Sequence, residues 1–315
     1  MRLSEILSKS LDETRGNLGT NFSLLAVFYI IPYIVVFGIL AFMFFSLGLQ
    51  DDLVGLSAIQ NGGTVAADQI SDEVISVLLP KIFALIGTGF VLFVLVWFIM
   101  IFGLLAIYAL SLKKSKFSFS EAVSEAKKHY WRTVGLNIVI GLLFLIATLV
   151  LYIIILIVAV GFIGVADVNG GIESNLAGAV IGILLVVLIG IVGFISIAGL
   201  LVYFVLSPFV LVKENKGVFA SLSDSVKLVK GRWKKVFGYS IVVFLIYIAF
   251  YILVSILSSI IQVVIVGTGP IEAFSMGYLI SLGISTVFQI IIFVLIMPFV
   301  LLFFKNFYLD IKKKK

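Results

Sequence analysis

The chain contains no cysteine, a single histidine and few charges, since only 12% of its 315 residues are Asp, Glu, Lys or Arg. Without cysteine it forms no disulfide, no thiolate metal site and no palmitoyl anchor. Soluble domains carry about 25% charged residues. With 62% hydrophobic residues, this chain has too few polar side chains to cover a soluble surface. The composition therefore excludes an ordinary soluble protein and indicates a membrane protein.

Six apolar blocks are each longer than the roughly 20 residues that span a hydrocarbon core about 30 Å thick. They cover residues 22–49, 77–112, 134–166, 176–212, 236–266 and 276–304. The first block differs from a cleaved signal peptide, because acidic residues precede it and it has no small-residue cleavage site. We expect an all-α integral membrane protein with six transmembrane helices.

Positive charge is confined almost entirely to one side of these blocks. Of the 22 Lys and Arg residues, 21 lie in the N-terminal segment, the second and fourth connections and the C-terminal end, and the exception is Lys81. Cytoplasmic segments are enriched in Lys and Arg. We therefore predict that both termini are cytoplasmic.

The basic segments also show an apolar stripe at helical spacing, most clearly in residues 219–236, again in 119–134 and more weakly in 3–18. Such helices lie in the membrane interface. Each basic residue near anionic headgroups contributes about 1 kcal/mol of attraction. We predict membrane lipids with anionic headgroups, or a protein partner, as the contact, and no nucleic acid. The predicted contact residues are Trp131, Arg132, Lys227, Lys230, Arg232, Trp233, Lys234 and Lys235.

Short matches between these segments suggest an internal repeat. The sequence SEILS at residues 4–8 aligns with SEAVS at 120–124, and the fourth and sixth blocks both end in PFVL. We expect three parallel repeats within one membrane domain, each an interfacial helix followed by a transmembrane hairpin. Convergence of juxtamembrane helices on Trp and Lys is the alternative. The expected repeats are residues 1–112, 113–212 and 213–315.

Several prolines lie inside apolar blocks, where the missing N–H bends or loosens a helix. Pro32, Pro208 and Pro298 are therefore candidate structural or hinge positions. Glu214 precedes an amphipathic segment, and a carboxylate there suits the positive end of a helix. Glycines of the fourth block, such as Gly193, permit close helix packing.

Few polar side chains lie deep in the blocks. Gln289, Ser196 and Thr148 are the candidate intramembrane polar residues, together with the serines of residues 255–259. Strongly polar side chains at such depth mark the substrate paths of transporters. A hydroxyl in a transmembrane helix usually bonds to its own backbone instead.

No nucleophile with a base, and no cluster of metal ligands, appears in the blocks. The only histidine, His129, stands beside two lysines, and we expect it to be solvated or to face headgroups. Asp68, Asp72 and Glu73 offer carboxylates to a cation, but a solvated acidic loop also accounts for them. We assign no catalytic, cofactor or metal residue and expect a protein that is not an enzyme.

One segment, SPFVLVKENKGVFASLSDSVKLVKGRW at residues 207–233, resembles the membrane domain associated with some glycerophosphoryl diester phosphodiesterases and related prokaryotic membrane proteins. The resemblance implies a six-span protein of the prokaryotic cytoplasmic membrane with cytoplasmic amphipathic helices. The phosphodiesterase barrel is absent, so that activity does not carry over. The matching positions are Pro208, Glu214, Gly217, Ser225, Gly231 and Trp233.

These observations lead to two functional hypotheses. The first is a non-enzymatic polytopic protein whose interfacial helices form a basic collar against anionic lipid or a partner. The alternative is a transporter or lipid-handling protein with a path between the repeated hairpins. In that alternative Pro208 and Pro298 act as hinges and Gln289 lines the path.

Overall fold

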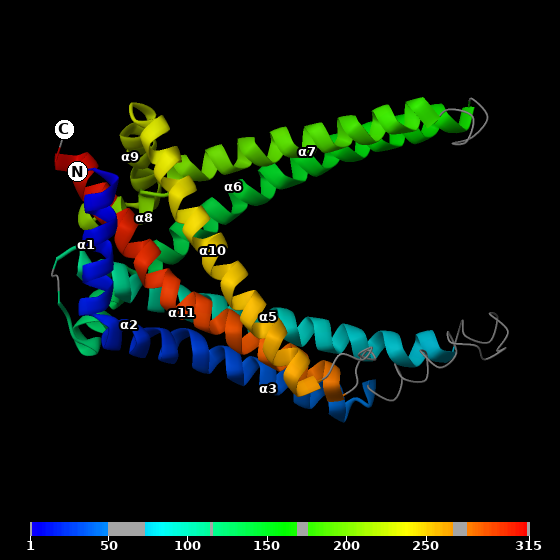
Figure 1. The fold of residues 1–315 in the computed structure, drawn as a ribbon, viewed down its shortest axis with the longest axis horizontal. Helices are drawn as coiled ribbons and strands as arrows, with labels where there is room; N and C mark the ends of the chain where they lie inside the picture. The colour runs from blue at the N-terminus through cyan, green and yellow to red at the C-terminus, as the bar shows by residue number, and fades with distance from the viewer. Residues whose placement is uncertain (1, 50–72, 114–115, 169–175, 267–275, 314–315) are drawn as a thin grey trace. The chain divides into compact units, whose positions relative to one another are not determined.

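A computed structural model describes residues 2–49, 73–113, 116–168, 176–266 and 276–313 (Figure 1). The regular structure in these ranges is entirely helical, which confirms the predicted all-α class. Asp68 and Asp72 lie outside the described residues. Six helical segments are long and apolar enough to cross a membrane: Leu18–Ser46, Ser76–Ser111, Phe119–Gly161, Val180–Lys213, Trp233–Val264 and Gly283–Lys313.

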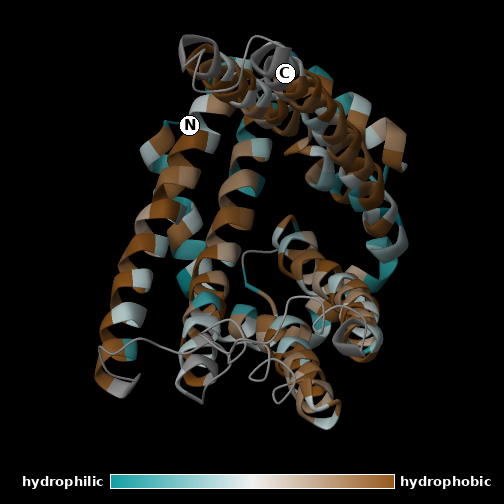
Figure 2. Cartoon of the chain, turned by 90° about the vertical axis from the view of Figure 1, so that its right-hand side faces the viewer, coloured by the Kyte–Doolittle hydropathy of each residue, from teal (hydrophilic) through white to brown (hydrophobic). Residues whose placement is uncertain are grey.

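Hydrophobic residues cover the long helices along their length (Figure 2). Many of these side chains point outward, and Phe90 and Phe194, for example, are 67% and 70% exposed. Large apolar patches of this kind are rare on soluble monomers. Lipid tails solvate such a surface, and the helices satisfy their own backbone groups as the bilayer requires. The chain is thus a multi-pass membrane protein.

Helix α1 (Leu3–Gly16) precedes the first span, which consists of three consecutive helical pieces: α2 (Leu18–Leu25), the π-helical turn η1 (Ala26–Ile30) and α3 (Ile31–Ser46). Pro32 is the second residue of α3, so the widened turn comes immediately before it. A proline ring displaces the carbonyl four residues earlier. Pro32 therefore widens the helix without ending it.

The second and third spans are uninterrupted helices, α5 (Glu73–Ser111) and α6 (Phe119–Val168). The 50 residues of α6 join the expected second interfacial helix to the span that follows it. The sequence predicted two elements here, but α6 contains no proline and Gly135 is tolerated inside it. The amphipathic segment is therefore the first part of a longer helix.

Pro208 separates two helices. The fourth span, α7 (Leu176–Phe204), ends before it, and α8 (Ser207–Lys213) begins with Pro208 in its first turn. Proline suits that position because the first N–H groups of a helix have no internal partner. Pro298, in contrast, is buried inside α11 (Met276–Lys313).

The third predicted interfacial helix is α9 (Val218–Lys230), and α10 (Trp233–Val266) follows after a short turn. Within its predicted apolar stripe, Leu222 and Val229 are buried, Phe219 is 76% exposed and Val226 is half-buried. Serine hydroxyls permit the burial that the pattern did not predict, and the Ser225 hydroxyl donates to the Tyr203 carbonyl at 2.6 Å. The buried residues of α9 are Ser221, Leu222, Ser225, Leu228 and Val229.

The chain divides into two compact units. The first unit comprises Met1–Tyr130 and Val243–Asn306, and the second comprises Trp131–Val242 and Phe307–Lys315. The long helices α6, α10 and α11 therefore contribute residues to both. This division follows packing and does not test the three-repeat hypothesis, which stays a prediction.

Close helix contacts within each unit depend on single glycines. In the first unit, a Cβ on Gly103 of α5 would lie 2.6 Å from the Phe28 Cβ. In the second unit, α6 and α7 run side by side (Figure 1), and a Cβ on Gly193 would lie 2.2 Å from Leu151 Cδ1. Small residues at such points let backbones approach. Gly193 therefore has the packing role that its position in the fourth block predicted.

Candidate functional sites

Two of the predicted lipid-contact residues have partners inside the second unit. Arg232 Nη1 donates to the Ile311 carbonyl at 2.7 Å, and Lys235 Nζ lies 3.5 Å from the carboxylate of buried Asp310. The Lys235 ammonium also lies 5.3 Å from the ring centre of Tyr239, which adds a cation–π contact. Arg232 and Lys235 thus fasten the start of α10 to the end of α11.

A charge network surrounds Glu214 at the turn between α8 and α9. Its carboxylate lies 2.6 Å from Lys216 Nζ and accepts hydrogen bonds from Lys312 Nζ and Tyr308 Oη, each at 2.8 Å. Partial burial raises the pKa of Glu214, but these hydrogen bonds outweigh it and lower that pKa to about 2. Glu214 does not cap α9, whose N-cap is Gly217. Its side chain instead connects the turn to α11.

Asp224 extends this network along α9. Its carboxylate accepts a hydrogen bond from Lys216, and Lys227 Nζ lies 3.3 Å from it. The hydrogen bond from Lys216 is the main reason that the pKa of Asp224 is lowered, and the Lys227 contact adds to it. Lys227, which the sequence assigned to headgroups, therefore has an ion-pair partner within its own helix.

Arg132 is also engaged. Its Nη1 atom donates to Asn215 Oδ1 at 2.7 Å. Asn215 has a φ of 52°, which places it in the left-handed region. Asparagine tolerates this conformation better than most residues because of its short polar side chain. The contact joins α6 to the turn before α9.

Of the four remaining predicted contact residues, three are exposed and one is half-buried. Lys230 and Lys234 are exposed, and neither forms an ion pair within the described residues. Trp131 is 74% exposed, whereas Trp233 is half-buried and stacks on Phe237 with ring centres 4.8 Å apart. Arg132 and Lys227 are exposed as well, but each has a side-chain partner within the unit. We refer to Lys230, Lys234, Trp131 and the neighbouring Phe219 as the exposed set.

The first unit contains a buried polar cluster that the sequence analysis did not identify. Lys305 Nζ and Glu13 Oε2 form an ion pair, although the Lys305 side chain is only 2% exposed. Asn306 Nδ2 donates to the same Glu13 oxygen at 3.0 Å and to Ser10 Oγ at 3.1 Å. These contacts fasten α1 to α11. No sequence pattern links residues almost 300 positions apart, so this cluster could not be found without the fold.

His129 corrects a sequence expectation. It is 8% exposed rather than solvated, and its Nε2 atom lies 3.6 Å from buried Glu125 Oε1. Lys113 and Lys128 both pair with Glu125 from more exposed positions. His129 shares its face of α6 with Ala122, Glu125 and Ala126, which are also buried. The small alanine side chains let this face pack inward. Within the described ranges, no three His, Asp or Glu side chains gather as metal ligands.

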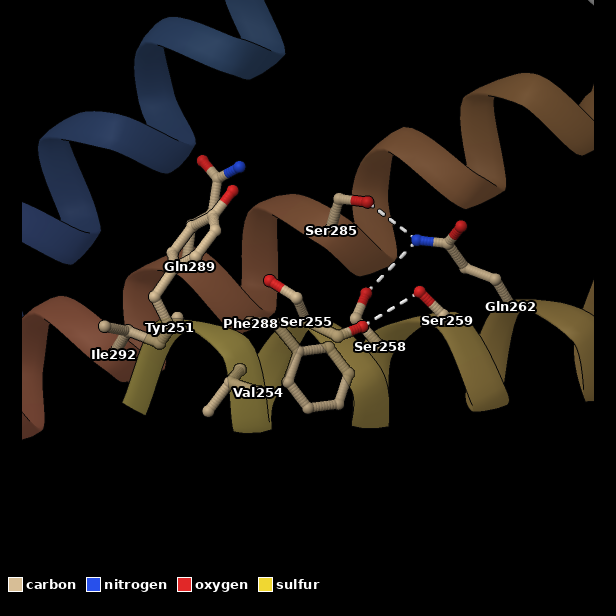
Figure 3. A pocket seen from close by; sticks show the side chains of 10 residues that line it. All are labelled: Tyr251, Val254, Ser255, Ser258, Ser259, Gln262, Ser285, Phe288, Gln289 and Ile292. Atoms are coloured by element: carbon tan, nitrogen blue, oxygen red, sulfur yellow. Dashed lines mark hydrogen bonds between the residues drawn. The ribbon is translucent and has the colours of Figure 1, made fainter. Parts of the chain in front are cut away.

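The second candidate site is a pocket in the first unit between α10 and α11 (Figure 3). Its volume is about 230 Å³. Gln289 lines it together with the serines of the fifth block that the sequence singled out. Thr148 and Ser196 belong to the second unit instead, where Ser196 Oγ donates to the Val192 carbonyl of its own helix at 2.8 Å. The lining residues are Tyr251, Val254, Ser255, Ser258, Ser259, Gln262, Ser285, Phe288, Gln289 and Ile292.

A protein family described as "Domain of unknown function (DUF7847)" matches residues 82–310, which is most of the chain. The chain belongs to this family. No curated protein and no solved structure matches it.

The DUF7847 match extends from the second span to near the end of the sixth. It contains the whole polar pocket, the Glu214 turn and α9. Helix α1, with Glu13, lies before the matched residues, whereas its partner Lys305 lies within them. The match carries no link to phosphodiesterase-associated membrane domains, so that resemblance stays a prediction.

Proposed function

We propose that this DUF7847 protein is a non-enzymatic, multi-pass protein of a prokaryotic cytoplasmic membrane that contacts anionic lipid headgroups through the exposed set of its second unit. The observation that supports this proposal most directly is the exposure of Lys230 and Lys234 beside paired neighbours. Arg232 and Lys235 already have partners within the unit. The positive-inside rule then assigns this end to the cytoplasm.

The exposed aromatic residues support the same proposal. Trp131 and Phe219 lie in amphipathic segments next to basic residues, with 74% and 76% exposure. Tryptophan favours the interface because its ring is apolar and its N–H is polar. Two unpaired lysines at about 1 kcal/mol each would favour anionic over neutral lipid by about 30-fold. Salt should weaken this preference.

The resemblance to phosphodiesterase-associated membrane domains fits this role at the level of architecture. Gly217 is the N-cap of α9, Gly231 is its C-cap, and Trp233 begins α10. The motif therefore marks helix boundaries beside the membrane. It supplies no group for phosphodiester cleavage, and we propose no such activity.

Native mass spectrometry in mixed anionic and zwitterionic lipid tests the proposal. Lys230→Gln and Lys234→Gln should each lower the number of retained anionic lipids. Lys81→Gln is the matched control, because it removes one charge from the side of the blocks that has no other Lys or Arg. Retention that is equal for all three variants and the parent would refute the lipid contact. A co-purifying polypeptide released by the Lys230 or Lys234 change would favour a protein partner.

A transporter or lipid-handling protein is the second candidate function. The specific observation that favours it is the convergence of Gln289 with the α10 serines in one pocket. Transporters place polar groups within the bilayer at substrate paths. Substrate-dependent uptake by reconstituted vesicles, lost in Gln289→Leu, would favour this function over the first.

A further inference from the structure

The pocket between α10 and α11 has one neutral polar wall and one apolar wall. Its polar groups are hydroxyls and carboxamides, and its apolar side is formed by Tyr251, Val254, Phe288 and Ile292. None of the described residues that line it carries a charge. A charged ligand would therefore lose its hydration without gaining a counter-charge.

Part of the polar wall is already satisfied. Gln262 Nε2 donates to Ser285 Oγ at 2.7 Å and to Ser258 Oγ at 3.1 Å (Figure 3). Gln262 Oε1 accepts from Ser281 Oγ at 3.0 Å. These bonds connect α10 to α11 and hold the wall in place, so the pocket is built before any ligand binds.

Two polar groups keep their hydrogen-bonding capacity. The Gln289 carboxamide and the Ser255 hydroxyl form no side-chain hydrogen bond within the described part of the chain, and both line the pocket. A carboxamide offers two donors and one acceptor oxygen, and a hydroxyl offers both kinds. A bound molecule with its own hydroxyls would satisfy them.

The position of the pocket along α10 indicates from which side of the membrane a ligand would reach it. Ser255 lies 22 residues after Trp233, the first residue of α10, and this corresponds to about 33 Å along the helix. The pocket is therefore in the part of α10 remote from the Lys-rich segment. In the predicted orientation, that half of α10 faces the outside.

We propose that this pocket binds an uncharged polyol group. Hydroxyls match the donors and acceptors of Ser255 and Gln289, and the C–H face of a polyol fits against Tyr251 and Phe288. A volume of about 230 Å³ equals roughly seven or eight water molecules, which is enough for a glycerol unit or one sugar ring. The source is either a free polyol or the uncharged headgroup of a glycolipid. The proposal does not depend on the headgroup contact of the second unit.

The absence of cysteine makes a sharp test available, because one introduced thiol is the only thiol. We would compare Ser259→Cys with Ile260→Cys in vesicles, using a small charged thiol reagent, because Ser259 lines the pocket but is not one of the two proposed ligand groups. The two positions are adjacent, but Ile260 is 55% exposed and does not line the pocket. The pocket thiol should react faster, since water or a soluble ligand reaches it.

Protection then identifies the ligand class. Glycerol, a monosaccharide or a glucosyl-diacylglycerol should slow labelling of Ser259→Cys about tenfold when present at about ten times its dissociation constant. Protection by the free polyols indicates a soluble ligand, and protection by the glycolipid alone indicates a lipid. Adding Gln289→Leu should raise the protecting concentration about tenfold without slowing labelling itself. Labelling of Ser259→Cys no faster than Ile260→Cys, or unaffected by every polyol, would overturn the proposal.

Discussion

Removing the Glu13 carboxylate should detach α1 from the first unit. In the native protein the Lys305 ammonium is almost completely buried and pairs with Glu13. Glu13→Gln keeps the size of the side chain and its contact with Asn306, but it leaves Lys305 as a buried charge without a counter-ion. The change therefore isolates the charge from the packing of α1, which also buries Ile6 and Ser10.

Breaking a buried ion pair by removing one partner costs about 3–5 kcal/mol. Because Glu13 retains some exposure, at 13%, we take the lower end of that range. About 3 kcal/mol corresponds to a rise of about 100-fold in the population with α1 undocked. Glu13→Gln combined with Lys305→Met removes both charges and should recover most of this loss.

Hydrogen exchange of the α1 amides measures undocking directly, since locally open states exchange. Asp12→Asn is the matched control: it neutralises the adjacent, exposed carboxylate of the same helix, where changes stay within about 0.5 kcal/mol. Exchange in Glu13→Gln should rise about 100-fold over the parent, and in the control no more than about threefold. Equal rates in both single variants, or no recovery in the double variant, would refute the reasoning.

Three further predictions concern the second unit. The pKa of Glu214 is lowered from 4.5 to about 2, so its contacts stabilise the α8–α9 turn fully above about pH 4.5, and this stabilisation is lost as the pH falls through about 2. Proteolysis of the turn should therefore increase as the pH falls over this range. Glu214→Gln should be susceptible to proteolysis at every pH. Gly193→Ala should destabilise the protein by about 1–3 kcal/mol, measured as a lower melting temperature in detergent. Gly190→Ala, whose Cβ would meet no atom within 4 Å, should leave the melting temperature unchanged. A similar loss in both variants would contradict the packing role of Gly193. Asn215→Gly should retain thermal stability because φ is 52° there, while Asn215→Ala should lose about 1 kcal/mol, and a reversed order would count against backbone strain.

The spans could be predicted from the sequence because lipid imposes a simple rule. Twenty or more apolar residues must form a helix that satisfies its own backbone. The effect of each proline on its helix could be predicted only in part. Pro208 lies in the first turn of a new helix, whereas Pro32 follows a π-helical turn in a helix that continues. The sequence indicated where the backbone would be perturbed, and the neighbouring residues decided in which form.

The fate of individual charges could not be predicted from the sequence. Lys230 and Lys235 look equivalent in the printed sequence, yet one is exposed and the other pairs with Asp310. That difference depends on how the end of α11 packs, which no local pattern encodes. The same holds for the pocket, since convergence of Ser255 with Gln289 depends on the relative rotation of two helices.

Fluorescence quenching by brominated lipids tests the headgroup contact most directly. Changing Trp97 and Trp233 to Phe leaves Trp131 as the only tryptophan, because the chain has three. We predict stronger quenching of Trp131 by brominated anionic lipid than by brominated zwitterionic lipid, with a difference that narrows as salt is raised. Equal quenching by both lipids at low salt, or no quenching by either, would contradict the account.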